Sequence, residues 1–166
     1  MKDNIVLIGM PGTGKSTVGL LLAKTLGKDF VDSDILIQVR EGKTLQQIMD
    51  ENDYLHLRQI EEQVLTDILG RNLVIATGGS AVYSEVAMEH LANNGTIVYL
   101  DTPLTVLRQR IRDYDTRGIA RRPDQSFEEL FAERTALYRR YADITVPGDL
   151  DTPDQVVAAI TTAIIK

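Results

Sequence analysis

Short apolar runs alternate along this chain with longer segments whose apolar residues recur at helical spacing. The β-branched run at residues 5–8 predicts a buried parallel strand. Further apolar runs predict four more strands, at residues 30–31, 73–76, 96–100 and 144–146. Helical spacing, with Ser or Thr start signals before several segments, predicts helices at 15–26, 54–69, 84–95 and 126–141, and further helices starting near 44, 103 and 153.

This alternation of strand and helix predicts one α/β domain spanning residues 1–166. Such a chain forms a three-layer α/β/α sandwich, in which helices cover both faces of a parallel sheet. Ligands of such folds bind beyond the carboxyl ends of the strands. The segments 9–17, 32–34 and 77–80 each follow a predicted strand, so we expect them to meet in one site.

The composition excludes several kinds of chemistry and partner. The chain has no cysteine, which excludes disulfides, thiolate metal sites and cysteine nucleophiles. Its 18 Lys and Arg residues against 24 Asp and Glu residues give a net charge of -6, so we expect no nucleic-acid partner. The apolar run after Met1 is too short for a signal peptide, and no run is long enough to cross a bilayer. We therefore expect a cytoplasmic protein without a membrane partner.

A phosphate-binding loop is the most specific motif in the chain. Residues 9–16, GMPGTGKS, fit the pattern G-x-x-x-x-G-K-[ST], whose glycines let several backbone N–H groups point at one phosphate. The lysine of this pattern reaches the β- and γ-phosphates, the Ser hydroxyl holds Mg²⁺, and the helix N-terminus favours the anion. The plain alternative is a glycine-rich turn between a strand and a helix. The expected nucleotide-binding residues are Gly12, Thr13, Gly14, Lys15, Ser16 and Thr17.

Two carboxylates close the second predicted strand. Asp32 and Asp34 occupy alternate positions, so their side chains would point the same way on a strand. Taken alone, the pair is better interpreted as a polar strand end with capping aspartates. Beside a nucleotide, one carboxylate can assist Mg²⁺ through its waters, and the other can take a hydroxyl proton as general base.

Arg58 and Glu61 lie three residues apart and share one face of a predicted helix. They form either an exposed ion pair or a unit in which Glu61 orients Arg58 toward a substrate carboxylate, and spacing alone does not choose. The paired glycines Gly78 and Gly79 allow the backbone to approach a ligand closely, although a simple turn also explains them.

The stretch from 108 to 122 is rich in arginine. Around Arg117 the hydrophobic periodicity is poor, which is typical of a mobile lid that delivers an arginine to a transferring phosphoryl group. Arg134 on the next helix is a further candidate anion clamp. We interpret the remaining arginines as solvated, namely Arg108, Arg112, Arg121 and Arg122.

Over nearly its whole length the chain resembles the shikimate kinase family, small P-loop enzymes similar to nucleoside monophosphate kinases. The resemblance rests on six features in matching order and spacing: residues 9–17, 32–34, 58–62 and 77–79, Arg117, and residues 133–134 followed by 137–138. It implies a central five-stranded parallel sheet of order 2-3-1-4-5. It also implies a core of residues 1–33, 71–106 and 126–166, a substrate-binding segment at about 34–62 and a lid at about 112–124.

The family resemblance also implies the reaction and the roles of individual residues. ATP is the co-substrate, Mg²⁺ the cofactor, and the γ-phosphoryl group passes to the 3-hydroxyl of shikimate, a step towards chorismate and the aromatic amino acids. Asp34, Arg58, Gly79 and Arg134 would hold shikimate, with both arginines on its carboxylate and Asp34 on its hydroxyls. Lys15 and Arg117 would stabilise the transferring group, Ser16 would ligate Mg²⁺ with Asp32 acting through water, and Arg110 would stack on adenine.

Four positions depart from the family pattern. Ser80 replaces a third glycine, Leu57 a phenylalanine, Ala136 a proline, and Gly118 the proline that usually follows the lid arginine. We expect all four at or near the acceptor site, leaving ATP binding unchanged. The alternatives are a kinase of the same fold for another hydroxy acid or sugar acid such as gluconate, a nucleoside monophosphate kinase, and a non-catalytic nucleotide-binding regulator. We expect a monomer.

Overall fold

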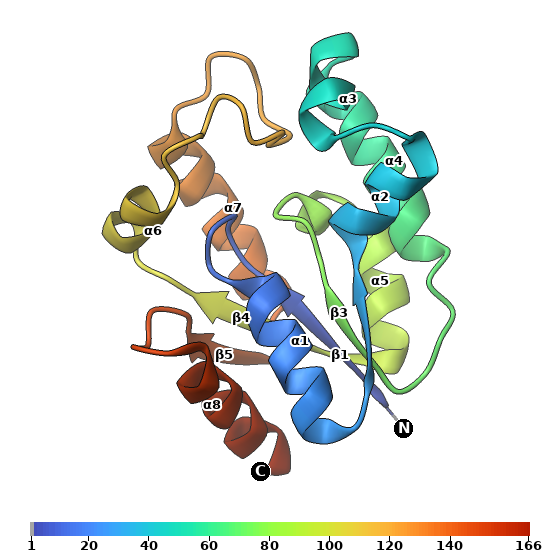
Figure 1. Cartoon of the computed structure of the whole chain (residues 1–166), viewed down its shortest axis with the longest axis vertical. Coiled ribbons are helices and arrows are strands. Elements are labelled where there is room, and N and C mark those ends of the chain that lie inside the picture. The colour runs from blue at the N-terminus through green and yellow to red at the C-terminus, as the bar shows by residue number, and fades with distance from the viewer. Residues whose placement is uncertain (1) are drawn as a thin grey trace.

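A parallel sheet organises the computed structural model, which describes residues 2–166 (Figure 1). Its strand order, β2-β3-β1-β4-β5, confirms the order that the resemblance implied. Every neighbouring pair runs parallel. The strands are β1 (Asn4–Ile8), β2 (Asp29–Asp32), β3 (Leu73–Ala76), β4 (Gly95–Asp101) and β5 (Ile144–Pro147).

The helices begin largely where the start signals predicted. Capping boxes at Thr44, Ser126 and Thr152 are all formed, and Gly27 adopts the left-handed conformation that ends the first helix. None of the helices in residues 2–166 combines the length and apolar character needed to span a membrane. The helices are α1 (Lys15–Leu26), α2 (Ser33–Glu41), α3 (Leu45–Glu51), α4 (Tyr54–Thr66), α5 (Glu85–Asn94), α6 (Leu104–Arg110), α7 (Phe127–Tyr141) and α8 (Pro153–Ile165), with a short 3₁₀ turn, η1 (Ala81–Tyr83).

Alternate residues of the central strand bury different sides of the sheet. Ile5 and Leu7 pack with residues of α1 and α8, whereas Val6 and Ile8 pack with residues of α4, α5 and α7. Figure 1 shows α1 and α8 together in front of the sheet. The three-layer α/β/α sandwich is therefore confirmed.

A smaller third cluster lies between α2, α3 and α4 and includes Ala120 from the segment 112–124. Through this cluster the predicted substrate-binding segment packs against the predicted lid. In Figure 1 the loop that contains residues 112–124 extends beside α3, beyond the carboxyl ends of the strands.

The structure corrects the prediction for residues 33–41. Strand β2 ends at Asp32, and Asp34 lies in the first turn of a helix that was not predicted, so the two carboxylates do not share a strand face. The cause is local: Asp32 Oδ1 accepts hydrogen bonds from the backbone N–H groups of Asp34 and Ile35 at 2.9 and 3.4 Å. The helix predicted at 54–69 ends earlier, at Thr66.

Candidate active site

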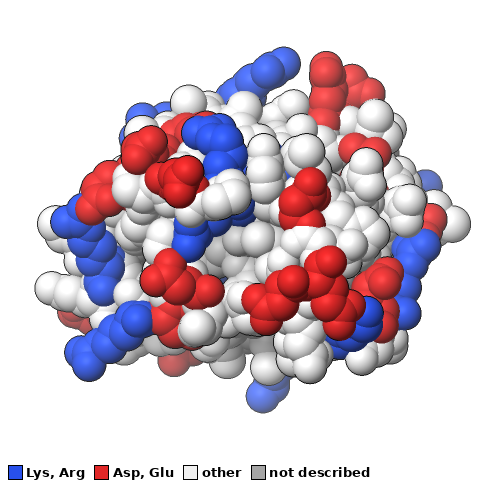
Figure 2. Space-filling view, turned by 90° about the horizontal axis from the view of Figure 1, so that it is seen from above, with Lys and Arg blue, Asp and Glu red and all other residues white. Residues whose placement is uncertain are grey.

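Loops after four of the strands surround a cavity of about 360 Å³. The segments after β1, β2 and β3, predicted to meet, all contribute to its lining, as does the segment 112–124. Figure 2 looks onto this end of the molecule, where Lys and Arg side chains reach a central hollow that Asp and Glu side chains flank. Of the predicted site residues, those that line the cavity are Gly12, Gly14, Lys15, Ser16, Thr17, Asp34, Glu61, Gly79, Arg110, Arg117 and Arg134.

The glycines of the phosphate loop hold a backbone shape that other residues would strain. Gly12 and Gly14 have φ values of 87° and 93°, and α1 begins directly after them at Lys15. A Cβ on Gly12 would lie 2.8 Å from Ile111 Cγ1, so the loop also needs this glycine to pack against the end of α6. Thr13 is buried beneath the loop and does not line the cavity.

Lys15 is a buried cation on the floor of the site. Its Nζ donates to the carbonyl oxygens of Gly9 and Met10 at 2.6 and 2.9 Å. Burial lowers the pKa of Lys15 to about 8; Asp34 opposes this effect, and Arg134 adds to it. An anion beside this ammonium would therefore gain a strong partner that water screens poorly.

Ser16 and Asp32 join the loop to the second strand. The Ser16 hydroxyl donates to Asp32 Oδ2, while Oδ1 of the same carboxylate caps α2. Hard oxygen ligands of this kind, at the N-terminal end of α1, fit Mg²⁺. Asp32 does not itself line the cavity, and its role through water stays a prediction.

Two carboxylates approach each other across Gly78. A Cβ on Gly78 would lie 2.1 Å from Glu61 Oε2 and 2.7 Å from Asp34 Oδ1, so only glycine fits between them. Burial and the neighbouring carboxylate of Asp32 raise the pKa of Asp34, whereas Lys15 lowers it. Burial and Asp34 raise the pKa of Glu61 to about 7. The site therefore holds carboxyl groups that are more basic than usual.

The predicted pairing of Glu61 with Arg58 is wrong. Glu61 Oε1 accepts a hydrogen bond from Ser80 Oγ at 2.5 Å, so the serine that departs from the family pattern binds this carboxylate. The Arg58 guanidinium lies over the Tyr83 ring, 3.6 Å from its centroid, and over Tyr54 at 4.8 Å. Arg58 is not among the residues that line the cavity, but it lies next to Ala120 and Arg134, which do.

Two guanidinium groups converge on one backbone carbonyl beside the cavity. Arg134 Nη2 and Arg58 Nη2 donate to the Ala120 oxygen at 2.8 and 3.2 Å. Arg134 is 1% exposed, and the Nε atoms of both arginines are buried without a hydrogen-bond partner in residues 2–166. A Cβ on Gly79 would lie 2.6 Å from Arg134 Nη1, so this glycine makes room for the guanidinium. Unsatisfied donors on two adjacent cations fit a carboxylate.

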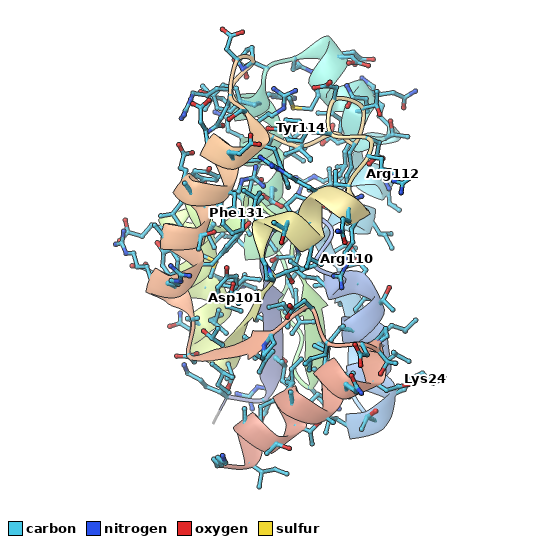
Figure 3. All side chains as sticks on the ribbon, turned by 90° about the vertical axis from the view of Figure 1, so that its left-hand side faces the viewer. Lys24, Asp101, Arg110, Arg112, Tyr114 and Phe131 are labelled. Atoms are coloured by element: carbon cyan, nitrogen blue, oxygen red, sulfur yellow. The ribbon has the colours of Figure 1, made fainter. Side chains whose placement is uncertain are left out.

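Two further predicted arginines lie at the rim. Arg110 Nη1 contacts the carbonyl oxygens of Gly12, Thr13 and Gly148 at 3.2 to 3.4 Å, which joins the phosphate loop to the segment after β5. In Figure 3 Arg110 lies between α6 and the start of α1. Arg117 lines the cavity with its guanidinium 3.7 Å from Asp113.

Some residues near the site had no assigned role in the sequence. No motif or spacing in the sequence marks Tyr83. Tyr138, whose hydroxyl donates to the Gly79 oxygen at 2.6 Å, was named in a family motif without a role. Arg121, predicted to be solvated, is 17% exposed, bonds Asp115 at 2.7 Å and lies over the Tyr114 ring. That prediction is wrong because carbonyls of its own loop enclose the guanidinium.

The four departures from the family pattern differ in their distance from the cavity. Ser80 and Gly118 line the cavity. Leu57 is buried in the cluster between α2, α3 and α4, and Ala136 is exposed on the outer side of α7. Of the four positions expected at or near the acceptor site, Ser80 and Gly118 are thus the two that line the cavity.

A glycine-rich loop between β1 and α1, on a parallel sheet of this order, defines a P-loop kinase. The family model described as "SKI: Shikimate kinase" matches residues 11–165. Because this match spans most of the chain, the protein belongs to the shikimate kinase family.

Individual relatives agree over nearly the full length. The shikimate kinase of Persephonella marina is 38% identical over 158 residues, which cover 95% of this chain and 96% of the relative. The crystal structure of shikimate kinase from Aquifex aeolicus superposes with a TM-score of 0.85 at 37% identity, covering 98% of this chain and 96% of the other. The shikimate kinase from Acinetobacter baumannii in complex with shikimate gives a TM-score of 0.90 at 32% identity, covering 98% and 93%.

Proposed function

We propose that this protein transfers the γ-phosphoryl group of ATP to the 3-hydroxyl of shikimate, giving 3-phosphoshikimate and ADP. The observation that carries the proposal is the joint lining of one cavity by Lys15, Asp34 and Arg134, which come from three different elements. Family membership supplies the acceptor's identity, because relatives of this length and similarity are shikimate kinases.

Asp34 is the proposed general base. Its carboxylate accepts the proton of the acceptor hydroxyl as the oxygen attacks the γ-phosphorus and the bond to the β-phosphate oxygen breaks. The raised pKa of Asp34 makes the carboxylate a better proton acceptor, and Glu61 beside it adds negative charge when ionised. Lys15 and Arg117 stabilise the charge that spreads over the transferring oxygens.

The phosphate loop and its neighbours hold the nucleotide in this proposal. The loop at Gly12, Thr13 and Gly14 holds the phosphates, Thr17 contacts the α-phosphate, and Arg110 packs on the adenine. In this structure the Thr13 N–H donates to the Met10 oxygen at 3.2 Å. Ser16, and Asp32 through water, would hold Mg²⁺, which would supply positive charge to the phosphates of ATP.

Arg134 and Arg58 are the proposed carboxylate clamp, and Gly79 gives the acceptor room to approach the backbone. Both guanidiniums already converge at Ala120, and a carboxylate there would satisfy donors that residues 2–166 leave unpaired. The segments 34–62 and 112–124 are proposed as substrate-binding segment and lid. The expectation of a cytoplasmic monomer stays a prediction.

A coupled ADP-release assay with Mg²⁺ and ATP tests the function. We expect acceptor-dependent ADP release with shikimate, and none with quinate, gluconate or nucleoside monophosphates. ADP release with gluconate alone would show that shikimate is not the acceptor, although the protein would still be a phosphotransferase. No acceptor-dependent release, together with tight ATP binding, would favour the nucleotide-binding regulator.

Replacing Arg58 by alanine should raise the KM for shikimate about ten- to hundredfold and change kcat within about threefold. The loss corresponds to one charge-assisted hydrogen-bonded contact to the acceptor. Steady-state kinetics at saturating ATP measure it. Arg139→Ala is the matched control, because Arg139 is exposed on α7 and lies outside the segments 34–62 and 112–124. An unchanged KM would show that Arg58 serves only to pack against Tyr83.

A further inference from the structure

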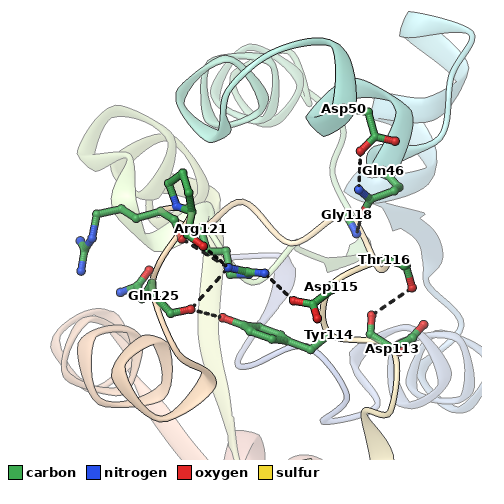
Figure 4. Close-up of polar contacts among 11 residues, drawn as sticks. Gln46, Asp50, Asp113, Tyr114, Asp115, Thr116, Gly118, Arg121 and Gln125 are labelled. Atoms are coloured by element: carbon green, nitrogen blue, oxygen red, sulfur yellow. Dashed lines mark hydrogen bonds and ion pairs between the residues drawn. The ribbon is translucent and has the colours of Figure 1, made fainter.

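One hydrogen bond joins the segment 112–124 to α3. The backbone N–H of Gly118 donates to Gln46 Oε1 at 2.8 Å, although the two residues are 72 positions apart in the chain. The other end of the same amide, Gln46 Nε2, donates to Asp50 Oδ1 at 2.8 Å. Figure 4 shows Gln46 placed between Asp50 and Gly118. The bond to Asp50 fixes which end of the amide faces Gly118, because a carboxylate accepts only from the nitrogen.

Gly118 has a conformation that makes this contact possible. It is buried, and its φ is 77°, in the left-handed region that favours glycine. A Cβ at this position would lie 2.5 Å from Leu45 Cβ and 2.6 Å from the backbone nitrogen of Gln46. The segment therefore lies directly against the first turn of α3.

The departure of Gly118 from the family pattern gives this chain a donor that a proline lacks. Proline has no backbone N–H and holds φ near −65°, so it can neither donate to Gln46 nor adopt the observed backbone. The contact to Gln46 is thus tied to the residue that this particular sequence carries after its lid arginine.

The hydrogen bond lies between two groups of the candidate site. Arg117, one residue before Gly118, lines the cavity and lowers the pKa of Lys15 by its charge. Ala120, two residues after Gly118, is buried, and its carbonyl accepts from both Arg58 and Arg134. A displacement of Gly118 would therefore move both a phosphate-side cation and the carbonyl at the acceptor end.

We propose that Gln46 is a positioning residue of the phosphoryl-transfer site, which holds Arg117 and Ala120 in place through its hydrogen bond to the Gly118 N–H. Gln46 touches neither substrate in this proposal, and its effect passes through the backbone of residues 117–120. The inference rests on the proposed function for its kinetic consequence, whereas the hydrogen bond itself exists independently of it.

Three variants test the proposal. Gln46→Ala removes the hydrogen-bond acceptor of the Gly118 N–H. Gln46→Glu combined with Asp50→Asn keeps an acceptor oxygen at the same length and gives it an amide donor at position 50 in place of a like charge. Gln63→Ala is a matched control from an exposed position on α4, outside the segments 34–62 and 112–124. We expect Gln46→Ala to lower kcat about three- to tenfold, as the loss of one hydrogen bond in the aligned state implies. Its KM for ATP and its melting temperature should stay close to those of the parent. The double variant should recover most of the lost kcat, and Gln63→Ala should match the parent.

Amide hydrogen exchange gives a readout that does not depend on turnover. In protein without substrates, peptides covering residues 117–120 should exchange faster in Gln46→Ala than in the parent and in Gln63→Ala. Unchanged exchange in Gln46→Ala would overturn the inference. So would an unchanged kcat, or equal losses of kcat in Gln46→Ala and Gln63→Ala. If the parent failed to phosphorylate shikimate but exchange still accelerated, the positioning bond would stand and the proposed function would fail.

Discussion

The Lys15→Met enzyme should show no measurable turnover with any acceptor, a loss of at least about a hundred- to a thousandfold in kcat. Methionine has a similar length and keeps an apolar stem, so the floor of the cavity stays filled. The substitution removes the only ammonium among the residues that line the cavity. The transition state then loses a buried cation that needs no reorganisation to meet developing charge, and the exposed Arg117 cannot replace it.

Lys24→Met is the matched control for this prediction. Lys24 is an exposed lysine in the last turn of the same helix, far from the phosphate loop in Figure 3, so its loss should leave kcat unchanged. Thermal melts of both variants separate catalysis from folding, because Lys15→Met also removes the hydrogen bonds to Gly9 and Met10. Turnover within tenfold of the parent in a folded Lys15→Met enzyme would contradict the role assigned to Lys15.

The parts of the fold that short-range chemistry determines were predictable from the sequence. Runs of β-branched residues indicate buried strands. Capping residues such as Ser126 and Thr152 mark helix starts, because their hydroxyls accept hydrogen bonds from N–H groups that the helix leaves free. The phosphate loop was predictable for the same reason, since its function requires glycines at fixed spacing. Its place beside the other strand ends followed from the parallel topology.

Helix α2 was not predictable in this way. Its residues include Ile35, Ile37 and Val39, whose β-branched side chains favour strands when read locally. The Asp32 cap and the burial of Ile37 among residues of α3 and α4 override that preference. Asp34 lies in a helix turn and not on the predicted strand, so its side chain points in a different direction than expected. It still lines the cavity, so the prediction that it belongs to the site did not depend on the secondary structure.

Side-chain partners distant in the chain were the least predictable part of the site. The spacing of Arg58 and Glu61 permitted an ion pair, but Ser80 and Tyr83, about twenty residues further along the chain, supply the actual partners. The Ala120 carbonyl lies 62 residues from Arg58 in the chain, so no local sequence pattern could predict the hydrogen bond between them. Such contacts depend on how distant segments pack against one another, which the spacing within one segment does not specify.

The Asp34→Asn enzyme should lose about a hundred- to ten-thousandfold in kcat, because the amide cannot accept the proton that the acceptor hydroxyl gives up. Its KM for shikimate should change much less, since asparagine keeps the size and a carbonyl oxygen that can still accept a hydrogen bond. Asp151→Asn, at an exposed position before α8, is the control and should behave as the parent.

The pH profile gives this prediction its sharpest test. In the parent, only the ionised Asp34 accepts a proton, so kcat should fall as pH drops through the pKa of this carboxyl. Burial and Asp32 raise that pKa, so the acid limb should begin at a higher pH than for an exposed aspartate. The residual rate of Asp34→Asn should lack this limb. If the limb persisted unchanged in the variant, a different group would carry it, and Glu61 would be the first to replace, because its pKa is raised to about 7 on the opposite side of Gly78.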